Sequence, residues 1–183
     1  MSQSDATGRD GLRPVLFWGV LIAVLVADLV TKAIAEYALV PQRMPREVIG
    51  DFVRFTLVYN PGAAFGLHLG GYSRWIFMAL TVGALFVLGR LYRTTRDSDW
   101  PRALAIGLVC AGALGNLVDR IRSPRGVVDF IDVGIGDMRW PTFNIADMAV
   151  SIGAFLLAWV LWGDDSPGES PASGRAAQEA AEV

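Results

Sequence analysis

The chain has 183 residues, of which 53% are hydrophobic and 19% are charged, and its formal net charge is −2. The length allows one domain, and the excess of apolar over charged residues favours a membrane protein over a soluble one. The weak negative charge argues against a nucleic-acid-binding protein. One histidine (His68) and one cysteine (Cys110) exclude a His-rich metal site and a disulfide within the chain.

Both ends of the chain are polar and lack helical or strand periodicity. Segments of this kind bury too little apolar surface to fold. We therefore expect three parts: a disordered N-terminal extension (1–13), a membrane domain (14–162) and a disordered acidic C-terminal tail (163–183).

The first apolar stretch, residues 15–34, has about the 20 residues that a helix needs to cross a bilayer. It is too long for the apolar part of a signal peptide and lacks a convincing cleavage site. Asp28 and Lys32 lie four residues apart near its far end, so they share a helix face and can pair. Two interpretations stay open: an ion pair whose lysine reaches interfacial water, or a role towards a substrate.

The first long connection, residues 36–71, contains a partly alternating segment, 48–59, that predicts a strand. Asn60, Pro61 and Gly62 follow it, which is typical of a turn. The spacing favours a plain turn, and the alternative is that the Asn60 amide helps to line a site.

Two further apolar stretches predict the second span (75–91) and the third span (100–118). Small residues recur every four positions along the third span, which indicates a face for close helix packing: Ala103, Gly107, Ala111 and Gly115. Cys110 lies within this pattern, and we expect a buried, inert thiol.

The third span becomes polar as it ends, with Asn116, Asp119 and Arg120 on the continuation of its packing face. A buried structural network explains these residues almost as well as a functional site does. The second long connection, 122–141, follows and contains a β-rich segment, 127–133.

The last span is predicted at residues 143–162. Asn144, Asp147 and Ser151 are spaced so that they lie on one face at the polar end of this apolar helix. That face must therefore point into the bundle rather than at lipid.

Four spans place both termini on one side of the membrane. Arginines crowd the short connection between the second and third spans, which indicates the cytoplasmic side: Arg90, Arg93, Arg96 and Arg102. The two long connections with their helix ends hold more basic residues than the inner segments, so charge alone does not fix the orientation.

Asp129 and Asp147 both lie beside apolar spans, where an ionised carboxylate is costly and marks a functional site. Two carboxylates held close together in a poorly solvated site share a proton. The ionised member can take a proton from an attacking water, while the protonated member polarises a carbonyl and later protonates the leaving amine. This chemistry predicts an aspartyl peptidase without a metal or another cofactor.

Other chemistries fit less well. A Ser-Lys peptidase would have to use Lys32, the one lysine, and pairing with Asp28 would keep it protonated. A small proton-coupled transporter would also explain acids in apolar surroundings. However, the chain shows no internal repeat, and its long outer connections form strands.

Two other aspartates compete with Asp129 for the catalytic role. Asp132 is three residues further along the same predicted strand, so its side chain should point to the opposite face. Asp119 is next to Arg120, which indicates a salt-bridged structural carboxylate.

Five sequence blocks occur in order along the four spans, and together they resemble those of the lipoprotein signal peptidases (type II signal peptidases). The blocks are Asp28-x-x-Thr-Lys32, Asn60-Pro-Gly-Ala-Ala-Phe65, Gly115-Asn-Leu-Val-Asp-Arg120, Val127-Val-Asp129-Phe130 and Phe143-Asn-Ile-Ala-Asp147. The resemblance covers about residues 15–162.

The resemblance implies a bacterial inner-membrane aspartyl protease that removes the signal peptide of prolipoproteins before a cysteine carrying diacylglycerol. It implies that Asp129 and Asp147 are the catalytic pair. It also implies supporting roles for a second set of polar residues: Asp28, Lys32, Asn60, Asn116, Asp119, Arg120 and Asn144.

The resemblance further implies that both termini are cytoplasmic and that the active site lies near the outer leaflet. The expected partners are lipid-modified prolipoproteins and the bilayer. The expected fold is a mainly α membrane protein, with four transmembrane helices and a small extracytoplasmic β-rich cradle that clamps the extended cleavage region.

Overall fold

The computed structural model describes residues 12–62 and 72–164. His68, the end of the second sequence block and most of the expected disordered extension and tail lie outside these ranges.

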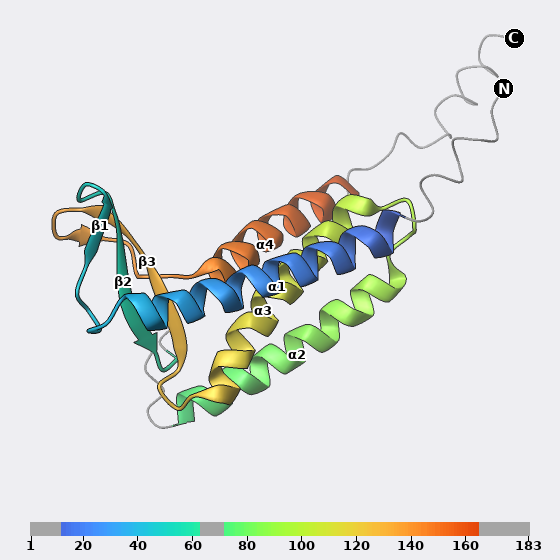
Figure 1. Ribbon diagram of the computed structural model, residues 1–183. Coiled ribbons are helices and arrows are strands. Elements are labelled where there is room, and N and C mark those ends of the chain that lie inside the picture. The colour runs from blue at the N-terminus through green and yellow to red at the C-terminus, as the bar shows by residue number, and fades with distance from the viewer. Residues whose placement is uncertain (1–11, 63–71, 165–183) are drawn as a thin grey trace, which may run out of the picture.

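Four long helices form the body of the protein: α1 (Leu12–Ala38), α2 (Ser73–Thr94), α3 (Trp100–Arg122) and α4 (Ile145–Asp164). Each is long and apolar enough to cross a membrane, so the four predicted spans are confirmed. Figure 1 shows them as one elongated bundle, with the start of α1 and the end of α4 at the same end.

Helix α3 is the central helix and packs against α1, α4 and α2. Its small residues make this possible, because a Cβ atom at Gly107 would lie 3.1 Å from the backbone oxygen of Phe17 on α1. A Cβ atom at Gly112 would collide with the backbone oxygen of Ala146 on α4, and one at Gly115 with the Asp28 carboxylate. The predicted small-residue face therefore brings α1 and α4 against α3, and Cys110 is buried beside it as expected.

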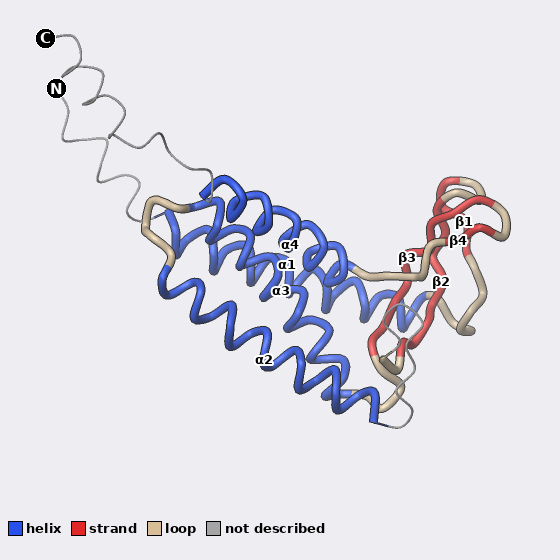
Figure 2. Tube along the Cα trace, turned by 180° about the vertical axis from the view of Figure 1, so that it is seen from behind, coloured by secondary structure: helices blue, strands red, loops and turns tan. Residues whose placement is uncertain are grey.

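A four-stranded antiparallel sheet stands at one end of the bundle (Figures 1 and 2). Its strands are β1 (Arg46–Ile49), β2 (Val53–Asn60), β3 (Val127–Ile135) and β4 (Met138–Arg139). The segment predicted as one strand over residues 48–59 is β-structure in the fold, but it is divided between β1 and β2. The chain turns at Gly50, whose φ of +49° suits glycine, and so makes two strands there.

The sheet joins the bundle through an apolar cluster and through main-chain hydrogen bonds. Leu39, at the end of α1, packs with Leu57 of β2 and Phe130 of β3. The backbone of Phe143, just before α4, exchanges hydrogen bonds with Ile131 of β3. Strand β3 is thereby tied to the beginning of α4, which places Asp129 beside the first turn of that helix.

Gly112→Ala should destabilise the protein, because its methyl group would meet the Ala146 backbone, which cannot move without shifting α4. We expect a loss of about 1–3 kcal/mol, the usual cost of overpacking, measured by thermal unfolding in detergent. Gly89→Ala on α2 is the matched control, since no atom lies within 4 Å of its Cβ position. Equal stability of the two variants would contradict close packing at Gly112.

Candidate active site

Lys32 lies at the centre of a buried polar cluster where the helices meet the sheet. Only 1% of its surface is exposed. Its Nζ atom is 2.8 Å from Asp28 Oδ2, 2.9 Å from Asp119 Oδ2 and 2.9 Å from Asn116 Oδ1. These three acceptors use all three protons of the ammonium group. The interpretation in which Lys32 reaches interfacial water is therefore wrong.

The two carboxylates around Lys32 extend the cluster to the sheet and to α4. Asp28 Oδ1 accepts a hydrogen bond from the backbone N–H of Ala146 in the first turn of α4 (2.9 Å). Asp119 Oδ2 accepts one from the backbone N–H of Val128 in β3 (3.2 Å). Asp119 is a salt-bridged carboxylate as predicted, but its partner is Lys32 rather than the neighbouring Arg120.

Asn144 lies just before α4, whose first residue is Ile145, and its side chain is buried inside the bundle as the sequence predicted. Its Oδ1 accepts from the backbone N–H of Asp147 (2.9 Å), and Asp147 Oδ2 accepts from the backbone N–H of Asn144 (3.2 Å). This reciprocal pair is a capping box. It holds the Asp147 carboxylate in the first turn, where the helix dipole favours negative charge.

Two amide side chains connect Asp129 with Asp147. Asn144 Nδ2 is 2.7 Å from Asp129 Oδ1, and Asn116 Nδ2 donates to Asp147 Oδ1 at 2.8 Å. The two amides also meet each other, with Asn144 Nδ2 at 3.2 Å from Asn116 Oδ1. The structure therefore brings the predicted aspartates into one connected cluster.

Asn60 serves both the turn and the site. Its Oδ1 accepts from the backbone N–H of Gly62 (3.1 Å), as expected of a turn residue, and its side chain also hydrogen-bonds Asp129. The two sequence-based interpretations of Asn60 are thus compatible.

Arg120 supplies positive charge next to the two aspartates. Its Nη1 donates to the backbone oxygen of Asn116 (3.3 Å), its guanidinium lies over the Phe77 ring (5.5 Å), and it is attracted by both Asp147 and Asp129. Its Nε atom is buried and, among the described residues, has no hydrogen-bond partner.

The electrostatics of the cluster favour a proton on Asp129. Only 2% of this side chain is exposed. Burial, and then the negative charge of Asp147, raise the pKa of Asp129 to about 7, although hydrogen bonds from Asn144 and Asn60 and the charge of Lys32 act against the increase. A carboxyl group that keeps its proton near neutral pH beside a second carboxyl is what general acid–base chemistry requires.

Asp147 is half-buried and faces a cavity of about 360 Å³ next to the cluster. Apart from Asp147 and Ser151, the side chains that line this cavity are apolar: Trp140, Phe143, Met148 and Ile152. The cavity is large enough for an apolar group of a substrate to lie against the carboxyl group. Within residues 12–62 and 72–164, no group of three or more His, Cys, Asp or Glu side chains is placed to hold a metal ion.

Asp132 belongs to a separate network, as its position on the strand predicted. Its carboxylate accepts from Arg139 Nε (2.8 Å), Thr56 Oγ1 (3.0 Å) and Arg54 Nε (3.2 Å). Burial raises the pKa of Asp132, but the hydrogen bonds from Arg139 and Thr56 and the arginine charges outweigh it and hold the pKa below its ordinary value. Asp132 is therefore an ionised carboxylate that stabilises the sheet.

The chain is similar to known proteins over most of its length. A family model described as signal peptidase (SPase) II matches residues 20–162. The lipoprotein signal peptidase of Teredinibacter turnerae is 41% identical over 150 residues, which cover 81% of this chain and 88% of that protein. The lipoprotein signal peptidase of Rhodococcus jostii is 43% identical over 150 residues, covering 79% and 71%. A solved bacterial membrane enzyme is similar with a TM-score of 0.75 and 35% identity, covering 84% of this chain and 92% of the other.

Asp129→Asn should stabilise the protein at alkaline pH. Because the pKa of Asp129 is about 7 in the fold, against 3.8 for an ordinary aspartate, the folded state keeps a proton that the unfolded chain releases between these values. The contribution of the protonated Asp129 to the stability of the wild-type protein is therefore complete below about pH 4, and it is lost as the pH rises through 7. At pH 8 the variant should exceed wild type by on the order of 2–4 kcal/mol, and the difference should shrink towards pH 5.

Thermal unfolding at both pH values measures this effect. Asp132→Asn is the control and should show the opposite sign at pH 8, because it removes a carboxylate whose ionised form is stabilised by arginines. A less stable Asp129→Asn protein at pH 8 would contradict the raised pKa.

Proposed function

The chain belongs to the signal peptidase II family, the lipoprotein signal peptidases, and we propose that Asp129 and Asp147 are its catalytic pair. It is an aspartic peptidase of the membrane that removes signal peptides from prolipoproteins. The observation that carries the assignment of the pair is the amide-linked cluster, in which a buried, proton-retaining Asp129 is held beside Asp147 at the start of α4.

The two carboxyl groups have different roles in hydrolysis, one as the general base and the other as the general acid. Asp147, as the carboxylate, takes a proton from water, and the resulting hydroxide oxygen bonds to the carbonyl carbon of the scissile peptide. Asp129, as the acid, hydrogen-bonds the carbonyl oxygen and then gives its proton to the leaving nitrogen as the C–N bond breaks. The pair ends with its single proton on Asp147, and return of that proton to Asp129 restores the starting state.

The surrounding groups orient the pair and the peptide. Asn116 donates to Asp147 Oδ1, the backbone N–H of Asn144 donates to Asp147 Oδ2, and the Asn144 amide donates to Asp129 Oδ1, so these groups fix the orientation of both carboxyl groups. A carboxyl oxygen has a second lone pair, which can still accept from water or substrate. Arg120 places positive charge where negative charge develops on the carbonyl oxygen during attack. Lys32 and Asp28 act at a distance from the peptide, as positioning residues that hold Asn116 and the first turn of α4.

The substrate has an apolar signal helix and, in this proposal, diacylglycerol on the cysteine that follows the scissile bond. The apolar cavity beside Asp147 could take part of such a substrate without an aqueous path, since its lining includes Trp140, Phe143 and Met148. We therefore expect the substrate to arrive laterally from the bilayer, with its extended cleavage region against the sheet.

The protein is a multi-pass membrane protein of a bacterial family. We place both termini in the cytoplasm and the aspartates near the outer leaflet of the inner membrane. The arginine-rich connection between α2 and α3 supports this orientation, and the aspartates lie at the opposite end of α3 from that connection. Because the chain belongs to a peptidase family, the alternative function considered from the sequence, a proton-coupled transporter, is not supported.

Asp129→Asn and Asp147→Asn should each abolish signal-peptide removal, because an amide can neither accept the water proton nor deliver one to the amine. The measurement is cleavage of a purified lipid-modified precursor by the reconstituted protein, with a loss of at least about 10³-fold, in the range of general acid–base effects. Asp132→Asn, matched in chemistry and on the same strand, should retain activity once its lower stability is allowed for. Turnover at the wild-type rate by either catalytic variant would refute the pair.

Cleavage should depend on the lipid. A precursor that carries diacylglycerol on its cysteine should be processed, whereas the same peptide with a free thiol should be processed far more slowly, because it cannot fill the apolar cavity. Single-turnover rates for the two peptides test this dependence. Equal rates would contradict lipid recognition and leave the catalytic assignment untouched.

A further inference from the structure

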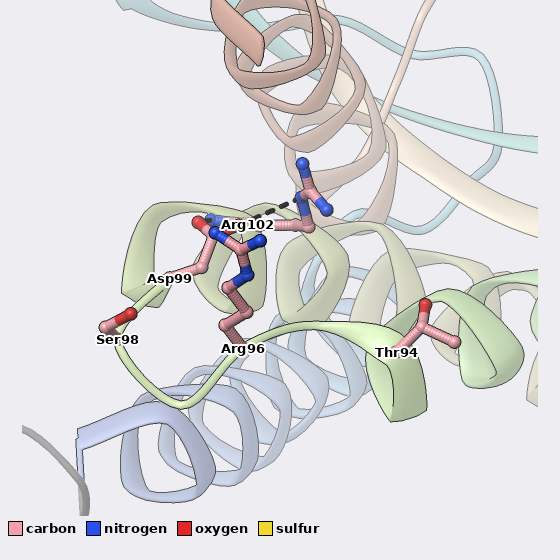
Figure 3. A pocket seen from close by; sticks show the side chains of 5 residues that line it. All are labelled: Thr94, Arg96, Ser98, Asp99 and Arg102. Atoms are coloured by element: carbon pink, nitrogen blue, oxygen red, sulfur yellow. Dashed lines mark hydrogen bonds and ion pairs between the residues drawn. The ribbon is translucent and has the colours of Figure 1, made fainter.

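A second cavity lies at the end of the bundle opposite the aspartates, beside the connection between α2 and α3. Its volume is about 670 Å³, and its lining is polar: Thr94, Arg96, Ser98, Asp99 and Arg102 (Figure 3). The 23 residues of α3 separate it from the active site, which at about 1.5 Å per residue amounts to roughly 35 Å. The peptidase mechanism therefore makes no use of this cavity.

One of the two arginines in this cavity is held in place by the fold. Asp99 caps α3 by accepting from the backbone N–H of Arg102 (3.2 Å), and its other carboxylate oxygen pairs with Arg102 Nε (3.1 Å). The Arg102 guanidinium is therefore anchored at the first turn of α3, where the helix dipole adds positive potential.

The second arginine is available to a ligand. The guanidinium of Arg96 makes no ion pair or hydrogen bond with any side chain or backbone group in the described ranges. Figure 3 shows it on the same side of the connection as the guanidinium of Arg102. Two planar, always-charged groups thus line one cavity. Among the described residues of this lining, the one carboxylate is Asp99, which already serves Arg102 and the helix cap.

The chemistry of the lining identifies the ligand class. Guanidinium groups match the oxygens of a phosphate group in bidentate geometry, and the Thr94 and Ser98 hydroxyls add further polar groups. Trp100, the first residue of α3 and the neighbour of Asp99 in the sequence, is 49% exposed, and such aromatic residues are enriched at the membrane–water interface. The cavity thus lies at the depth where the phosphates of lipid headgroups are concentrated.

We propose that this cavity binds a phosphate group through Arg96 and Arg102, supplied by an anionic phospholipid headgroup or by free phosphate. Juxtamembrane arginines attract anionic lipids with about 1 kcal/mol each. Under the orientation given above, the site faces the cytoplasmic leaflet and would fasten that end of the bundle to it.

The test uses the full chain in detergent and native mass spectrometry. Phosphatidylglycerol is compared with a galactolipid that has the same acyl chains and no phosphate. Wild type should retain phosphatidylglycerol preferentially, and Arg96→Gln should bind it about fivefold more weakly. Arg93→Gln, on the last turn of α2 and outside the cavity lining, is the matched control and should bind normally. Both variants should keep peptidase activity. A failure of lipid binding can therefore be distinguished from a failure of the proposed catalytic pair.

A second arm separates the two phosphate sources. A rise in melting temperature with inorganic phosphate that Arg96→Gln removes identifies the free ion as a ligand. Selective lipid binding without that rise identifies the headgroup. Equal retention of both lipids without a phosphate effect, or equal losses in Arg96→Gln and Arg93→Gln, would overturn the proposal.

Discussion

One buried ammonium group holds the catalytic end of this protein together. Burying a charge is costly unless it is fully paired, and Lys32 meets that condition with Asp28, Asp119 and Asn116. The two carboxylates carry the connection on to Ala146 of α4 and to β3. A single cation on α1 thereby fixes α3, α4 and β3 relative to one another. Its loss would leave two buried carboxylates unpaired, a change that usually costs about 3–5 kcal/mol.

This constraint also explains why the catalytic aspartates can differ in their surroundings while remaining neighbours. Strand β3 buries Asp129 under the sheet, whereas the first turn of α4 leaves Asp147 partly open to the apolar cavity. Asn116 connects the Lys32 ion pairs with the catalytic pair, because its side-chain oxygen accepts from Lys32 while its side-chain nitrogen donates to Asp147. The same small-residue face on α3 that allows close packing, at Gly112 and Gly115, gives the space in which this network forms.

Much of this arrangement could be predicted from the sequence, and the rest depends on contacts between distant residues. The four spans follow from apolar length, and the Asp28–Lys32 pair follows from helix periodicity. The Asn144–Asp147 capping box also has a signal in the sequence, a polar residue three positions before an acid at the start of an apolar run. The spacing of the same residues with Ser151 equally fits one face of a helix, so the sequence does not distinguish the two. The ion pair between Asp119 and Lys32 could not be predicted from the sequence, because Lys32 is 87 positions away and no sequence pattern near Asp119 favours it over the adjacent Arg120. The split of the first strand depends on Gly50, whose positive φ appears only in the folded chain.

The central claim is that Asp129 carries the shared proton of the pair at neutral pH. Infrared spectroscopy of the reconstituted protein measures this directly, through the carbonyl stretch of a protonated carboxyl group. We expect a band that is present at pH 6, disappears as the pH rises through about 7 and is missing from Asp129→Asn. A wild-type spectrum with no such band at pH 6, or a band that survives in the variant, would contradict the account.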